Sequence, residues 1–138
     1  MVKIVVVEDH EAIRGLLCRL LEAEPDIQVV GAASDGREGL QIAAERHPDV
    51  VISDLIMSEM NGLELTRELH CQFQAIGIII LTMYGDSVYV EQALKAGALG
   101  YLLKGDDFSQ IVRAIHDVSL GRRYLSPSLP EINMPSTN

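Results

Sequence analysis

The sequence predicts an α/β fold in which helices cover both faces of a parallel β-sheet. Short apolar segments rich in β-branched residues alternate along the chain with longer amphipathic segments. An apolar segment of this kind is typical of a strand buried on both faces, and each amphipathic segment is typical of a helix with one apolar stripe. Five strand-then-helix units in succession indicate parallel strands joined by right-handed crossovers.

The five predicted strands are short and almost entirely apolar. They cover residues 2–7, 27–33, 50–52, 76–81 and 99–103. The first of these shows the pattern most clearly, because five of its six residues are Val or Ile. Such continuous runs favour the interior of a parallel sheet over an exposed sheet, where apolar and polar residues alternate.

The predicted helices follow the strands and carry apolar residues at helical spacing. They cover residues 13–21, 36–46, a segment from Asn61 through Leu69, 86–96, and 108–115 with an end near Gly121. Asn61 is a residue type that caps helix N-termini, and Gly97 is well placed to end the fourth helix. From Ser126 onward the chain holds three prolines and polar residues. We therefore expect one domain over residues 1–125 and a linker or disordered tail over 126–138.

Composition narrows the classes of function. Eleven basic residues face twenty acidic ones, so the formal net charge is −9, which disfavours nucleic-acid binding by this chain itself. It favours a metal site or a basic partner. No apolar run approaches membrane-spanning length, and the N-terminal one is cut off by Glu8 and Asp9. Cys18 and Cys71 lack metal-type spacing, which predicts buried or half-buried thiols in a reduced, cytoplasmic setting.

Polar side chains stand where the predicted strands end. Sites in open α/β sheets form at the carboxyl ends of the strands. Four of the five predicted strands end in residues that carry chemistry: Glu8 and Asp9, Asp54, Thr82, and Lys104. Each of these would be an ordinary loop or capping residue if it stood alone. Together, in neighbouring strands, they predict one site with three carboxylates, a hydroxyl and an amine.

This combination indicates phosphoryl chemistry. Three carboxylates at close range need a cation, and hard oxygen ligands favour Mg²⁺. Asp54 is the candidate nucleophile, because carboxylates form aspartyl phosphates. Lys104 would neutralise a phosphoryl oxygen and Thr82 would donate a hydrogen bond to another.

The motifs at these positions also resemble a known family. They are the segments 7–10 (VEDH), 54–57 (DLIM), 60–62 (MNG), 81–83 (LTM) and 97–98 through Lys104. Over residues 2–125 the chain resembles a response-regulator receiver domain of two-component signalling. The segments 81–84, 100–104 and 124–127 resemble its NarL/LuxR branch, whose members usually carry a C-terminal helix-turn-helix that binds DNA.

The resemblance implies a flavodoxin-like (βα)5 sandwich with strand order 2-1-3-4-5. Asp54 would be the phosphoacceptor, and Thr82 and Lys104 would bind the phosphoryl group. Metal would be held by carboxylates and one carbonyl: Glu8, Asp9, Asp54 and the backbone oxygen of Ile56. Tyr101 would be the switch aromatic that moves inward together with Thr82.

The resemblance also implies partners. A sensor histidine kinase would donate the phosphoryl group, a homodimer would form on phosphorylation, and DNA would be bound only through a helix-turn-helix module that is not in this chain. The chain would take part in its own phosphoryl transfer and slow autodephosphorylation without being an enzyme. A stand-alone receiver that acts by protein contact or in a phosphorelay is the main alternative.

Two further alternatives belong to other classes. An Asp-dependent phosphatase would carry a second Asp two residues after the nucleophile, where this chain has Ile56. Flavodoxin-like nucleotide binding would need a Gly- or Ser/Thr-rich loop after the first strand, where acidic residues would repel phosphate. The chain departs from the common receiver pattern at three positions: Glu8 replaces Asp, Ser58 replaces proline, and Gly105 replaces proline.

Overall fold

The strands of the computed structural model form a single parallel sheet. The structure describes residues 1–57 and 59–130. The strands are β1 (Val2–Val7), β2 (Ile27–Ala33), β3 (Val50–Ser53), β4 (Gly77–Thr82), β5 (Gly100–Leu103) and β6 (Tyr124–Leu125). Their order in the sheet is β2-β1-β3-β4-β5-β6, and every neighbouring pair is parallel. The predicted α/β class and the order 2-1-3-4-5 are confirmed, and β6 adds a strand that the sequence did not predict.

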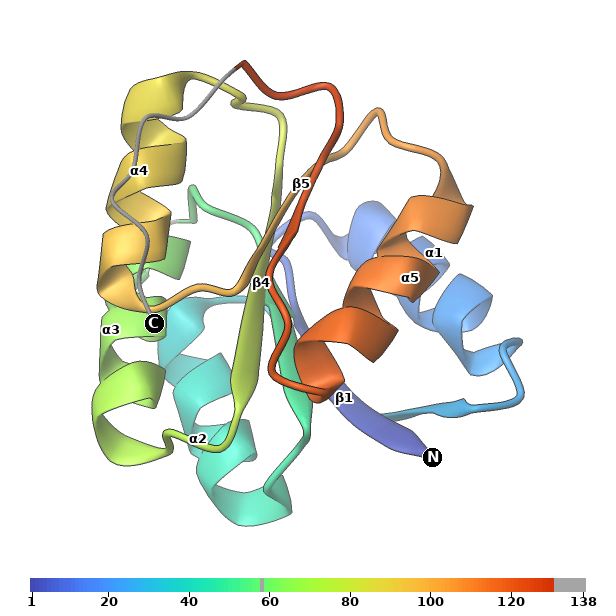
Figure 1. Cartoon of the computed structure of the whole chain (residues 1–138). Helices are drawn as coiled ribbons and strands as arrows, with labels where there is room; N and C mark the ends of the chain where they lie inside the picture. The colour runs from blue at the N-terminus through green and yellow to red at the C-terminus, as the bar shows by residue number, and fades with distance from the viewer. Residues whose placement is uncertain (58, 131–138) are drawn as a thin grey trace.

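In the described part of the chain, five helices follow the first five strands and lie on two sides of the sheet. They are α1 (Glu11–Glu22), α2 (Gly36–Arg46), α3 (Gly62–Gln72), α4 (Ser87–Ala96) and α5 (Phe108–Ser119). Figure 1 shows α1 and α5 together on one face and α2, α3 and α4 on the other. Among residues 1–57 and 59–130, no helix combines the length and the apolar character needed to cross a bilayer.

Each face of the sheet has its own apolar core, because alternate strand residues point to opposite faces. On β4, Ile78 and Ile80 belong to the core beneath α2, α3 and α4, whereas Ile79 and Leu81 belong to the core beneath α1 and α5. All six residues of β4 are buried. This two-sided burial explains why the central strands are continuous apolar runs rather than alternating ones.

Local hydrogen bonds set the helix ends that lie beside the carboxyl edge of the sheet. The His10 side chain caps α1 by accepting from the Ile13 amide. Asn61 caps α3 within a capping box: its side chain accepts from the Glu64 amide at 2.9 Å, and the Glu64 carboxylate accepts from the Asn61 amide at 3.2 Å. The predicted cap at Asn61 is thus confirmed. At the opposite edge of the sheet, Gly97 ends α4 with φ 119°.

The chain stays packed on the domain for a few residues after β6. Ser126 is 3% exposed and its amide donates to the Tyr101 carbonyl oxygen at 2.9 Å. Leu129 packs against the core beneath α2, α3 and α4. The rest of the predicted tail, residues 131–138, lies outside the described residues, as does the departure at Ser58.

Candidate functional site

Three carboxylates meet at the carboxyl edge of the sheet. Glu8 and Asp9 follow β1, and Asp54 follows the neighbouring strand β3, where its amide donates to the Val7 carbonyl oxygen at 3.0 Å. One oxygen from each carboxylate lies within 4.8 Å of the others. Glu8 is buried, Asp54 is half-buried and Asp9 is exposed. The sequence prediction that these three side chains converge is therefore correct.

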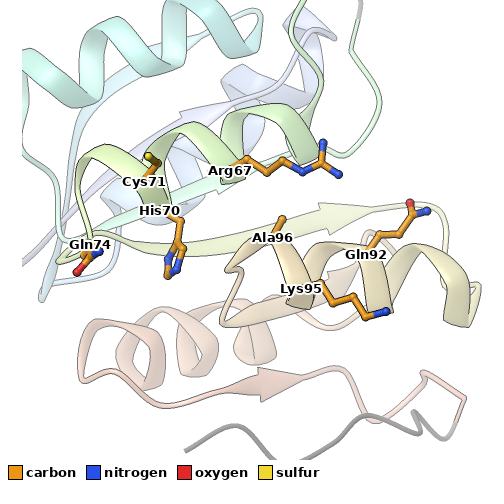
Figure 2. A pocket seen from close by; sticks show the side chains of 7 residues that line it. All are labelled: Arg67, His70, Cys71, Gln74, Gln92, Lys95 and Ala96. Atoms are coloured by element: carbon orange, nitrogen blue, oxygen red, sulfur yellow. The ribbon is translucent and has the colours of Figure 1, made fainter.

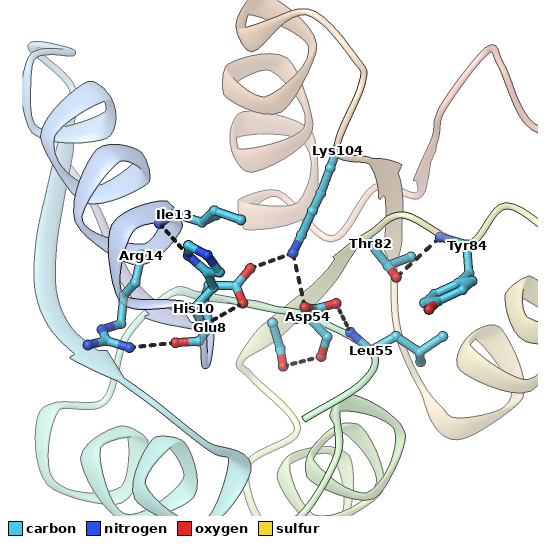
Figure 3. Close-up of polar contacts among 10 residues, drawn as sticks. Glu8, His10, Ile13, Arg14, Asp54, Leu55, Thr82, Tyr84 and Lys104 are labelled. Carbon is cyan, nitrogen blue, oxygen red and sulfur yellow. Dashed lines mark hydrogen bonds and ion pairs between the residues drawn. The ribbon is translucent and has the colours of Figure 1, made fainter. Parts of the chain in front are cut away.

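Lys104 joins this cluster from the end of β5. Its Nζ lies 2.6 Å from Glu8 Oε1 and 3.0 Å from Asp54 Oδ2, as Figure 3 shows. Burial by itself would lower the pKa of Lys104, but hydrogen bonds to Glu8 and Asp54 and the charges of both carboxylates raise it overall. Lys104 is therefore a fixed cation at neutral pH, held in contact with the proposed acceptor.

Burial makes the ionised form of the Glu8 carboxylate unfavourable within this cluster. Burial raises the pKa of Glu8, the Lys104 ammonium and the His10 amide oppose that shift, and the charge of Asp54 adds to it. Burial is the largest of these effects, so the opposing pull of Lys104 does not cancel the rise. An added cation would stabilise the ionised carboxylates, and carboxylate oxygens at this spacing suit a hard divalent ion.

The Asp54 carboxylate is held by both of its oxygens. Oδ1 accepts from the Leu55 amide at 2.7 Å, while Oδ2 contacts Lys104. The loop that carries it is also tightly packed, since a Cβ on Gly62 would lie 2.1 Å from the Asp54 carbonyl oxygen. Gly62, the glycine of the MNG segment, is therefore required by the close approach of α3 to the loop that carries Asp54, which we call the acceptor loop.

Thr82 ends β4 and lies beside Asp54 (Figure 3). Its hydroxyl oxygen accepts from the Tyr84 amide at 3.3 Å, and the residue is fully buried. Within the described part of the chain, the Thr82 hydroxyl hydrogen has no acceptor. It is therefore free to donate to a new oxygen beside Asp54.

Two other predicted site residues lie outside this cluster. Tyr101 lies in β5 with its ring fully buried, and its hydroxyl donates to the Tyr84 carbonyl oxygen. Burial, and after it the charge of Asp86, raises the pKa of Tyr101 well above its usual range, so the hydroxyl stays a donor.

Ile56 follows Asp54 by two residues and is 52% exposed. Metal binding by its carbonyl oxygen stays a prediction.

Arg14 is a site residue that the sequence analysis missed. Its guanidinium donates to the Glu8 carbonyl oxygen at 2.8 Å and so fixes the loop that carries both β1 carboxylates. A cation near the N-terminus of a helix is unfavourable, because the helix dipole is positive there. The presence of an arginine so near the start of a predicted helix was therefore the sequence feature that could have indicated a role for Arg14.

A separate hollow between α3 and α4 was considered as a site. It has a volume of about 540 Å³ and is lined by Arg67, His70, Cys71, Gln74, Gln92, Lys95 and Ala96 (Figure 2). None of these residues belongs to the predicted constellation. Cys71 is exposed, so the expectation of a buried or half-buried thiol is wrong for Cys71, whereas Cys18 is half-buried.

Comparison with known proteins agrees with this geometry. Residues 4–116 match the family described as the response regulator receiver domain. The chain belongs to this family. As a receiver domain, it is 42% identical to the transcriptional regulatory protein LiaR of Bacillus subtilis over 121 residues, which cover 88% of this chain and 57% of LiaR.

Other receiver domains give the same result. DegU of Brevibacillus brevis is 34% identical, with 93% of this chain and 54% of DegU covered. The receiver domain thus spans about half the length of the curated relatives it matches. A LuxR-family response regulator from Aurantimonas superposes with a TM-score of 0.89 at 36% identity, covering 94% of this chain and 92% of that one. The NarL receiver from Mycobacterium tuberculosis gives 0.84 at 31% identity, covering 88% and 98%.

Proposed function

We propose that this receiver domain is a phosphorylation-dependent switch in which Asp54 accepts a phosphoryl group from a sensor histidine kinase. The observation that carries the proposal is the contact of Lys104 with Asp54 inside the carboxylate cluster. It supports the proposal because a carboxylate, a fixed cation and oxygens suited to a metal ion lie close together there. The relatives named as transcriptional regulators support a role in transcription, through a DNA-binding module that is not in this chain.

The transfer is a displacement at phosphorus. An Asp54 oxygen forms a bond to phosphorus while the bond between phosphorus and the donor histidine nitrogen breaks, and the leaving imidazole takes up a proton from solvent water. Lys104 balances charge on a phosphoryl oxygen, and the free hydroxyl hydrogen of Thr82 bonds a second one. Positioning and charge neutralisation then supply most of the rate.

Magnesium is the proposed cofactor, because the donor set consists of hard oxygens. Glu8, Asp9, Asp54 and the Ile56 carbonyl would hold it. When bound, the ion neutralises charge on the transferring oxygens and shields the carboxylates from one another. Arg14 keeps the backbone of the Glu8 loop in place for this role.

The Asp54 assignment is tested by phosphoryl labelling. Asp54→Ala should abolish labelling by acetyl phosphate and by a phospho-histidine kinase, and so should chelation of Mg²⁺. Asp86→Ala is the matched control, since Asp86 is an exposed carboxylate whose side chain caps no helix amide. Stoichiometric labelling of the Asp54 variant at the wild-type rate would refute the assignment.

An apolar groove beside Lys104 is the proposed kinase contact. It has a volume of about 360 Å³, and its walls include Leu16 of α1, Met83 and Lys104. Leu16→Glu should slow transfer from the kinase but leave labelling by acetyl phosphate unchanged. Val88→Glu is the matched control, because Leu16 is 51% and Val88 52% exposed. Equal loss in both variants would exclude this groove as the contact.

One alternative concerns how the receiver domain passes on its signal. A stand-alone receiver would act by protein contact or pass its phosphoryl group onward, and a homodimer on phosphorylation fits either case. The coding sequence beyond Asn138 distinguishes the two, because a transcription regulator needs a helix-turn-helix there. A cytoplasmic location follows from the proposed kinase and DNA partners.

A further inference from the structure

The turn that follows Lys104 is closed by two hydrogen bonds of Asp106, one from its backbone amide and one to its carboxylate. The Asp106 amide donates to the Leu103 carbonyl oxygen at 2.9 Å, and Asp106 Oδ2 accepts from the Leu103 amide at 2.9 Å. Between them, Gly105 is exposed, and a Cβ placed on it would meet no atom within 4 Å. A glycine in such a turn leaves the backbone loose, so the two Asp106 bonds fix the direction from which Lys104 reaches Asp54.

The other oxygen of the same carboxylate holds the chain that leaves the domain. We call residues 124–129 the exit segment. Ser126 Oγ donates to Asp106 Oδ1 at 3.0 Å, and the Ser126 amide donates to the Tyr101 carbonyl oxygen at 2.9 Å. Ser126 Oγ also accepts from the Ser128 amide at 3.2 Å. Ser126, which is 3% exposed, therefore connects the exit segment to the Lys104 turn and to Tyr101 of β5.

The exit segment also reaches the loop after β4. Leu129 Cδ2 lies 3.4 Å from the position that a Cβ on Gly85 would take. Leu125 and Leu129 pack against the core that contains Tyr101. The loop next to Thr82, the strand of Tyr101 and the turn of Lys104 are thus all in contact with one short segment.

We propose that Asp106 is a positioning residue for Lys104, and that Ser126 makes the exit segment respond to the state of the phosphoryl site. The regulatory part rests on the proposed function of Asp54. If Lys104 follows a phosphoryl oxygen, its turn moves with it. Because both oxygens of Asp106 are engaged, that motion either carries Ser126 along or breaks the Ser126–Asp106 bond. Either outcome changes the path of the exit segment, which gives the site a physical connection to whatever follows it.

The first experiment needs no ligand. In the metal-free 138-residue chain, Ser126→Ala should raise amide hydrogen exchange at Leu103 and along residues 124–129 about three- to tenfold, the loss expected for one hydrogen bond. It should also shift the NMR signal of the Lys104 ammonium, which a role confined to the exit segment would leave in place. Ser126→Thr keeps the hydroxyl and should restore both values. Ser128→Ala, which removes a hydroxyl two residues away, should change neither.

The positioning role of Asp106 is tested by comparing beryllofluoride binding in two neighbouring variants. Asp106→Ala should weaken beryllofluoride binding in saturating Mg²⁺ about three- to tenfold, because Lys104 is no longer aimed at Asp54. Asp107→Ala makes the same change of charge one residue later, where the side chain caps no helix amide, and should bind normally. Equal binding by the two variants would refute the positioning role.

The regulatory role is decided by NMR shifts with beryllofluoride. In the wild-type chain, the ligand should shift signals both at Asp54 and along residues 124–129. In Ser126→Ala the pocket shifts should remain while those of the exit segment fall to less than about half. Unchanged shifts of the exit segment in Ser126→Ala would overturn the connection. A wild-type chain with no pocket shifts would instead refute the proposed function, and the ligand-free exchange measurement would still decide whether Ser126 and Lys104 are linked.

Discussion

The Tyr101 hydroxyl donates a 2.5 Å hydrogen bond to the carbonyl oxygen of Tyr84, and the Tyr101 ring is fully buried. The structure thus shows Tyr101 in the inward position that the sequence analysis expected of the switch aromatic. A ligand can shift an equilibrium only between states that it binds differently. We therefore expect the phosphoryl group to act on the balance between inward and outward Tyr101 rather than to create the inward state.

Removing this hydroxyl should loosen the loop after β4. Tyr101→Phe keeps the buried ring but loses the bond to Tyr84, so the free energy of unfolding should fall by about 1 kcal/mol. Amide exchange at residues 84–86 should rise. Urea denaturation and NMR measure the two effects. Tyr124→Phe is the control, because the Tyr124 hydroxyl makes only a long 3.5 Å contact with Gln110; an equal loss there would contradict the importance of the Tyr84 bond.

Thr82 should carry the signal from Asp54 to Tyr101. Its hydroxyl oxygen already accepts from the Tyr84 amide, so a bond to the phosphoryl group would move the loop that Tyr101 holds. In Thr82→Ala, beryllofluoride should still shift signals at Asp54 and Lys104 but no longer along residues 83–101. Thr66→Ala removes another buried hydroxyl, one that bonds the Gly62 carbonyl, and should leave the remote shifts intact. Remote shifts that survive in Thr82→Ala would exclude this route.

Glu8 should make the metal-free protein less stable as pH rises. Burial raises the pKa of Glu8 above its model-peptide value of 4.5, so the folded state keeps a proton that the unfolded state has already lost. Stability from this group is then present below pH 4.5 and is lost as pH rises through the folded pKa. Glu8→Gln should remove that loss.

Urea denaturation in a chelator at pH 4 and pH 7 provides the check. Relative to wild type, Glu8→Gln should gain stability between the two values, while Glu22→Gln, an exposed control on α1, should not. A Glu8→Gln difference that is the same at both pH values would show that no raised pKa operates there.

Mg²⁺ should stabilise the folded chain by mass action. At a free concentration of 100 times Kd, the gain in the free energy of unfolding should be about 2.7 kcal/mol. Asp9→Asn removes one ligand charge and should lower the gain at the same Mg²⁺ concentration. Asp86→Asn should not, because its carboxylate lies outside the cluster. Thermal unfolding with and without Mg²⁺ measures this, and equal gains for wild type and Asp9→Asn would exclude Asp9 as a ligand.

Two glycines offer a matched test of packing at the acceptor loop. In Gly62→Ala the new Cβ would meet the Asp54 carbonyl oxygen at 2.1 Å, so the loop must shift and stability should fall by about 1–3 kcal/mol. Phosphoryl labelling should slow as well. Gly105→Ala meets no atom within 4 Å and should change stability by less than about 0.5 kcal/mol. Similar behaviour of the two variants would contradict the close approach at Gly62.

The sheet and the carboxylate site could be predicted from sequence for one physical reason. A strand segment buried on both faces must be apolar, so residues 4–7 of β1 and 78–81 of β4 are visible as uninterrupted apolar runs. Once the strands are placed, the rule that parallel strands end at one edge brings Glu8, Asp54 and Lys104 together without any further information.

The features that were missed depend on contacts with no periodic pattern. A two-residue strand such as β6 has too few positions to show a repeat. The bond from Tyr101 ends on a backbone carbonyl, and every residue offers one. The Asp106–Ser126 bond links side chains twenty residues apart, and its partners are residue types common in any turn.

The two residues of β6 also decide where the chain departs. After β5 the chain passes along α5 away from the carboxyl edge of the sheet. If the domain ended with α5, any domain that followed it would begin at the end of the sheet opposite Asp54. Because β6 runs parallel to β5, with Tyr101 paired to Leu125, it turns the chain back toward the edge that holds Asp54. A protein fused after Leu129 would begin beside the site. A fusion made at Gly121 would begin at the opposite end, so the two junctions offer a way to build sensors that differ only in their distance from the phosphoryl group.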